Sequence, residues 1–145
     1  MMAKQSESTS VKGQVQYIHP PALHYNPAFT NVVKVTGPAK TVYVGGQNAL
    51  DQSGTIVGKG DIKKQTEQIL TNIQIALAAA GARLEHVVKW NLFVVQGQPI
   101  QEGFEVFQRV WGNRPNPPAI SMAFVAGLAN PDFLAEMDAI AVIPE

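Results

Sequence analysis

V-V-K-W-N-L-F-V-V (residues 87–95) predicts a β-strand at the centre of a sheet. β-branched and aromatic residues dominate it, as is typical of strands. Its even-numbered positions are all apolar, and Val87, Phe93 and Val95 make the odd-numbered face largely apolar too. Lys89 and Asn91 are the polar residues of that second face. A strand with two largely apolar faces is expected to be covered on both sides.

Helical patterns flank this strand on both sides. Before it, apolar residues recur at helical spacing over residues 62–80, between a candidate N-cap at Asp61 and a stop at Gly81. After it, a second helix is expected to follow Pro99 and to end at Gly112. The apolar stripe of this second helix consists of aromatic residues: Phe104, Phe107 and Trp111.

Four further strands are expected, at residues 32–35, 41–47, 119–125 and 133–143. The chain order is then ββαβαββ, which predicts an α+β fold. Two strand–helix–strand units imply parallel pairings with right-handed crossovers, which place both helices on one face of a mixed sheet. Nothing in this plan covers the other face, so we expect the chain to self-associate through it.

Composition excludes several function classes. The chain has 145 residues, for which we expect a disordered tail over residues 1–16 and a single domain over 17–145. Eleven basic residues balance eleven acidic ones, so charge favours neither nucleic acid nor an anionic membrane as a partner. Cysteine is absent, which excludes thiolate catalysis and fits a reducing cytoplasm. No apolar run approaches the ~18 residues of a membrane span.

Glu136 and Asp138 are the most interesting carboxylates, because residues two apart on a strand share a face. Ile140 continues that face, so the pair leads into apolar surroundings. A carboxylate lining a pocket can hold a water molecule for proton transfer. Charge on an edge strand, where it blocks aggregation, is the alternative interpretation and from the residues alone the favoured one.

Other candidate sites are weaker. The histidines lack helical pairing at i+3 or i+4, so we expect no metal site; they are His19, His24 and His86. Gly45 and Gly46 lie at the end of a strand, where glycine allows close approach of a ligand or another backbone, or simply forms a bulge. No dinucleotide or nucleophile motif is present, so no cofactor is expected.

Four stretches resemble the reactive intermediate deaminase A (RidA/YjgF, L-PSP endoribonuclease-like) family in order and spacing. They are V-Y-V-G-G-Q (42–47), I-A-L-A-A-A-G-A-R-L-E-H-V-V-K-W-N-L-F-V (75–94), P-P-A-I-S (117–121) and L-A-E-M-D-A-I-A-V-I (134–143). The resemblance covers roughly residues 29–143. It implies a chorismate-mutase-like homotrimer with sheets packed inward and small-molecule clefts between subunits.

The resemblance also implies site residues. In the family's deaminases, the arginine of P-A-R-S grips the substrate carboxylate, and a glutamate on the last strand positions the attacking water. The glutamate matches Glu136, whereas the arginine position holds Ile120. The remaining matched positions of the cleft are expected to bind substrate: Phe29, Gly45, Gly46, Gln47, Phe104, Ser121 and Met122.

Ile120 cannot form the bidentate pair that suits arginine to carboxylates, so the cleft is expected to prefer a less anionic ligand. The first hypothesis is a divergent hydrolase or deaminase of imines, enamines or related C–N compounds, with water directed by Glu136. The second is a non-catalytic trimer that binds small apolar ligands or proteins. Ribonuclease activity ranks third, because the charge is neutral and no catalytic histidine pair is present. Other cations considered as replacements for the arginine are Lys89, Arg109 and Arg114.

Overall fold

The structure is a computed structural model that describes residues 11–145. Its elements are β1 (Gln14–Ile18), β2 (Val32–Thr36), β3 (Ala39–Gln47), α1 (Ile62–Ala79), a short 3₁₀ helix (Leu84–His86), β4 (Val87–Val95), α2 (Ile100–Trp111), β5 (Ala119–Val125) and β6 (Ala135–Pro144). Every predicted helix and strand is present, and β1 is an addition. Residues 1–10 of the expected tail lie outside the described residues, while its end at residue 16 falls within β1.

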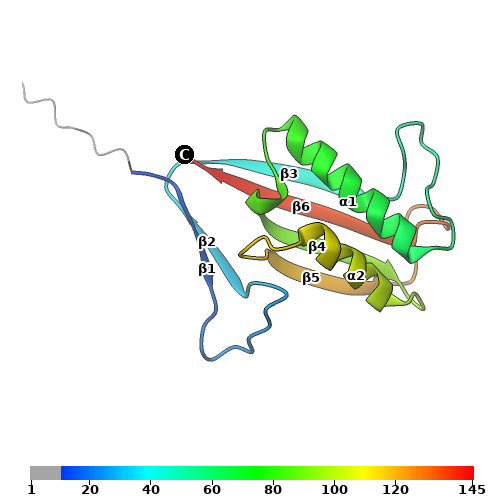
Figure 1. Ribbon diagram of the computed structural model, residues 1–145, viewed down its shortest axis with the longest axis horizontal. Helices are drawn as coiled ribbons and strands as arrows, with labels where there is room; N and C mark the ends of the chain where they lie inside the picture. Colours follow the sequence, from blue (N-terminus) through cyan, green and yellow to red (C-terminus); the bar gives the residue numbers. More distant parts are fainter. Residues whose placement is uncertain (1–10) are drawn as a thin grey trace, which may run out of the picture.

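The main sheet has four strands in the order β3-β6-β4-β5. β4 and β5 are parallel, whereas β6 runs antiparallel to both of its neighbours. Both helices lie over the same face of this sheet, as predicted (Figure 1). β1 and β2 form a separate antiparallel hairpin that extends away from the sheet (Figure 1). The fold is therefore α+β, with a mixed sheet covered by two helices.

The core lies between the helices and the sheet. From β4, Trp90 is 1% exposed and packs edge-to-face on two aromatic rings of α2. Its ring centroid lies 4.8 Å from that of Phe107 and 5.8 Å from that of Trp111. Edge-to-face pairs contribute about 0.5–1.5 kcal/mol each beyond the burial of area. The aromatic stripe that predicted α2 therefore fixes this helix on the sheet.

Local signals set the ends of α1. The Asp61 carboxylate accepts hydrogen bonds from the backbone amides of Lys63 and Lys64, which otherwise lack partners in the first turn. At the other end, Gly81 adopts a φ of 76°, which glycine tolerates without steric cost. These residues match the predicted boundaries.

The face of the sheet opposite the helices, here called the open face, carries alternate residues of the strands. On β4 and β6 the cross-strand pairs of this face are Lys89 with Ile140, Asn91 with Asp138, and Phe93 with Glu136. On β3, Tyr43 pairs with Ile140 and is 78% exposed. Tyr43 lies on the edge strand β3, and its exposed aromatic ring beside Ile140 makes this face suited to a partner. Among the described residues, no helix is long and apolar enough to cross a membrane.

Candidate functional site

A groove of about 560 Å³ lies between α2, β5 and the loop that joins β1 to β2. Phe29 comes from the loop, Phe104 from α2, and Ile120 and Met122 from β5. Side chains of Ile120 and Met122 point to the helix side because β5 pairs in register with β4, where Trp90 and Leu92 occupy that side. The groove therefore gathers four of the residues that were predicted to bind substrate.

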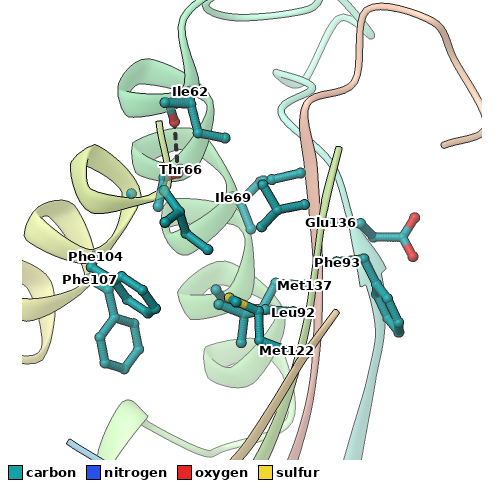
Figure 2. Close-up of a pocket in the computed structure, with 14 residues that line it drawn as sticks. Ile62, Thr66, Ile69, Leu92, Phe93, Phe104, Phe107, Met122, Glu136 and Met137 are labelled. Atoms are coloured by element: carbon teal, nitrogen blue, oxygen red, sulfur yellow. Dashed lines mark hydrogen bonds between the residues drawn. The ribbon is translucent and has the colours of Figure 1, made fainter. Parts of the chain in front are cut away.

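The floor of the groove is apolar and includes residues that the sequence analysis did not assign to the site. These are Leu92 of β4 together with Phe107 and Trp111 of α2. The spacing of Phe104, Phe107 and Trp111 along one helix face was the signal that could have found them. A smaller apolar cavity of about 40 Å³ adjoins the groove and shares Leu92, Phe104, Phe107 and Met122 with it (Figure 2).

Arg114 is the charged residue nearest to Ile120 in this groove, but its guanidinium is already bound. Nε donates to the Glu85 carboxylate at 2.7 Å, and Nη1 donates to the carbonyl oxygens of Val110 and Trp111, each at 2.9 Å. The hydrogen bond from Arg114 lowers the pKa of the Glu85 carboxyl, which therefore stays ionised at neutral pH. Arg114 thus caps the C-terminal end of α2.

The other two cations considered as replacements for the arginine lie elsewhere. Arg109 bonds Glu67 of α1 at 2.8 Å. Lys89 lies on the open face and donates to the Ser121 hydroxyl at 2.7 Å. Because side chains alternate along β5, Ser121 points to the open face, whereas its neighbours Ile120 and Met122 point to the groove.

Glu136 lies on the open face, opposite to the groove. On β6 it pairs with Phe93, and Figure 2 shows both side chains on the side of the strands away from Phe104 and Met122. The interpretation of Glu136 as an edge-strand charge is wrong, because β6 is an interior strand between β3 and β4. Glu136 is among the residues that line the cavity of about 40 Å³, but its carboxylate points to the open face (Figure 2). Within one chain, the sheet therefore lies between this carboxylate and the substrate groove.

Gly46 lies directly against Glu136. The register of β3 shifts between Val44 and Gln47, so the two glycines form the bulge that was one of their predicted roles. A Cβ atom on Gly46 would lie 2.9 Å from both the carboxyl carbon and Oε2 of Glu136. Glycine therefore makes room for this carboxylate. Gly45 has no atom within 4 Å of such a Cβ, and its carbonyl accepts a hydrogen bond from Gln47 Nε2 at 3.1 Å.

Two hydrogen-bonded pairs continue the polar part of the open face. Asn91 donates to the Asp138 carboxylate at 2.8 Å, alongside the bond from Lys89 to Ser121. Asp138 is thus held by a neighbouring amide, while Glu136 has Gly46 beside it. Among residues 11–145, no group of three or more His, Asp or Glu side chains is placed to hold a metal ion.

Comparison with known proteins places this arrangement in a family. A family model described as Endoribonuclease L-PSP matches residues 21–143. The chain belongs to the L-PSP (RidA/YjgF) family. A RutC family protein from Synechocystis sp. is 36% identical over 107 residues, which cover 71% of this chain and 78% of that protein.

Solved structures of L-PSP family proteins have the same fold. The Rid family protein YyfB from Yersinia pestis, described as of unknown function, superposes with a TM-score of 0.78 at 28% identity, over 89% of this chain and 98% of that one. A putative endoribonuclease from Thermotoga maritima superposes with a TM-score of 0.65 at 30% identity, over 82% and 94% of the two chains. The chorismate-mutase-like fold expected of an L-PSP family member is confirmed.

Proposed function

We propose that the chain forms a homotrimer and hydrolyses small imines, enamines or related C–N compounds in clefts between its subunits. The separation of the groove from Glu136 by the sheet carries this proposal. Among residues 11–145, the lining of the groove contains no carboxylate, so a site that uses both the groove and Glu136 needs the groove of one subunit beside the open face of another. Membership of the L-PSP family supports the reaction class.

In the proposed reaction, the water oxygen adds to the carbon of the C=N bond while Glu136 accepts one water proton. Glu136 returns this proton to the nitrogen, which gives a carbinolamine. The carbinolamine then collapses to a carbonyl as its hydroxyl proton is transferred to the nitrogen, which breaks the C–N bond and releases ammonia. One imine and one water thus give one carbonyl compound and one ammonia. A carboxylate at hydrogen-bond distance from water can act as the general base of such a step.

Ammonia release from a panel of imines, enamines and amides tests the proposal. Replacement of Glu136 by Gln removes the base and keeps the size of the side chain, so the rate should fall by about 100-fold or more. Asp138→Asn is the matched control, since Asp138 lies on the same strand and face. Equal rates in wild type and Glu136→Gln would place the chemistry elsewhere.

The apolar groove also supports a second candidate function, a non-catalytic trimer that binds small apolar ligands. Phe104 and Met122 are each 38% exposed, so the groove stays open in the single chain. This function predicts ligand binding without turnover of any compound in the panel, and no effect of Glu136→Gln on that binding.

A further inference from the structure

The groove is larger and more apolar than a small carboxylate-bearing substrate requires. Its volume of about 560 Å³ falls within the roughly 300–1,000 Å³ of clefts that bury drug-sized ligands. Where the family's arginine-bearing members place a cation, it has Ile120, with Met122 two residues further on the same side of β5. A carboxylate placed against these side chains would lose water without gaining a partner.

Within the described part of the chain, the groove lining has no unpaired cation that could bind a substrate carboxylate. Of its lining residues, Arg114 alone carries a charge, and Glu85 neutralises it at 2.7 Å. The remaining polar side chains of the lining, Asn26 and Gln108, are uncharged amides. Gln108 provides both a donor and an acceptor for a neutral polar group.

Aromatic side chains dominate the walls of the groove. Phe107 and Trp111 present parallel rings with centroids 6.4 Å apart and an interplanar angle of 6°. Phe29, Phe104 and Met122 also line the groove, and Phe104 and Met122 are each 38% exposed. Aromatic rings and thioethers both pack favourably against a further aromatic ring.

We propose that this groove selects an uncharged aromatic substrate, whose ring packs against Phe104, Phe107 and Met122. The proposal rests on the groove being the substrate-binding half of the proposed site. It names the substrate class as neutral aryl-bearing C–N compounds, with aromatic amides as stable members of that class. The C–N end of the bound molecule points out of the groove, where a neighbouring subunit would supply Glu136.

Tryptophan fluorescence measures occupancy of this groove directly. The chain has two tryptophans; Trp111 lines the groove and Trp90 packs against it. The probes are phenylacetamide and phenylacetate, which share a ring and a linker but differ in charge. We expect the wild-type protein to bind phenylacetamide at least about tenfold more tightly, because only the carboxylate pays for burial without an ionic partner. Equal or tighter binding of phenylacetate, or no binding of either probe, would overturn the proposal.

Variants assign the charge preference to the groove. Ile120→Arg should reverse the preference in favour of phenylacetate, and Met122→Arg provides the same test one position along that side. Ile75→Arg is the matched control: this isoleucine of α1 is 63% exposed and lines neither cavity, so its replacement should change nothing. An equal shift in Ile75→Arg would show that net charge, not the groove, sets the preference.

Glu136→Gln separates this inference from the proposed function. Phenylacetamide should still bind that variant, because its ring packs in the groove of one subunit, whereas Glu136 of the neighbour would reach only its C–N end. Binding of the amide without turnover of any C–N compound would refute the hydrolase and leave the ligand class standing. Turnover of carboxylate-bearing imines with no affinity for the amide would support the hydrolase and refute the proposed ligand class.

Discussion

By the motif resemblance, Ile120 takes the position at which arginine-bearing members of the family are expected to pair with a substrate carboxylate. Among the described residues, the only cation of the groove lining is paired with Glu85. Arg114 is held by Glu85 and by two backbone carbonyls, and Arg109 and Lys89 point to other partners. We therefore propose that the identity of one residue sets the charge that the groove accepts. The same reasoning applies to Gly46, whose missing side chain leaves space for the carboxylate of Glu136.

Turnover of simple 2-imino acids tests the effect of Ile120 on substrate binding. Because a hydrogen bond to a charged group contributes about 1.5–3 kcal/mol, its absence should slow turnover of 2-iminopropionate by roughly tenfold to more than a hundredfold relative to Ile120→Arg. The decay of enzymatically generated 2-iminopropionate measures both rates. Rapid turnover by wild type, unchanged in the variant, would point to another cation in the assembled site.

The space that Gly46 leaves beside the Glu136 carboxylate can be tested by substitution. Gly46→Ala places a methyl group 2.9 Å from the carboxyl of Glu136, so the flexible carboxylate must move while the backbone need not. We expect ammonia release to fall by about tenfold or more, since general-base catalysis depends on hydrogen-bond distance to water. Thermal unfolding should be nearly unchanged. Gly127→Ala, with no atom within 4 Å of the new methyl group, should retain the wild-type rate.

At the scale of elements, local patterns predicted helices and strands well because each pattern acts within one segment. The strand at residues 87–95 is observed with the predicted ends, and α1 and α2 begin and end at the predicted capping residues. β1 was missed because its five residues follow the polar stretch that was assigned to a tail, and because it pairs with β2 across a long loop without a tight-turn signal.

The pairing of distant strands could not be predicted from the sequence. The position of β6 between β3 and β4 depends on contacts far apart in the chain, and so does its register against β4. Ile120 and Glu136 were both expected in the site, but only that register shows that they occupy opposite faces. Sequence patterns thus identified residues of the groove and of the open face. They did not show that these residues lie on opposite faces of the sheet.

Gln65 of α1 connects this helix to the start of β6 through its side-chain amide. Its buried side chain donates to the carbonyls of Gly58 and Asp132 and accepts from the amide of Leu134, just before β6 begins. Gln65→Ala should lower the free energy of unfolding by at least about 1–3 kcal/mol, because it strands buried backbone groups. Gln74→Ala on the exposed side of the same helix should cost far less. Denaturant unfolding that gave equal losses would contradict this role.

In the whole molecule, the two helices cover one face of the sheet (Figure 1). The open face carries Tyr43, Phe93 and Ile140. Burial of this face against further copies of the chain would cover its apolar side chains, and the proposed assembly also places Glu136 of one subunit beside the groove of the next. The proposed assembly thus meets two separate requirements of the fold, one of stability and one of chemistry.

The proposed assembly predicts a mass of three times 15.6 kDa by light scattering at micromolar concentration. Tyr43→Glu should lower this mass, because it places charge on a side chain that is 78% exposed in the single chain. Circular dichroism should stay that of a folded protein. A wild-type mass of one chain would refute the trimer.

Cross-linking tests most directly whether the site is made from two subunits. The chain has no cysteine, so Ile120→Cys with Glu136→Cys introduces the only thiols. Within one chain these thiols lie on opposite faces of the sheet and cannot be bridged by a short bismaleimide. A site shared between subunits predicts covalent dimers and trimers of the double variant on a denaturing gel, and mostly single chains of either single variant. A double variant that stays entirely monomeric on that gel would contradict the shared site.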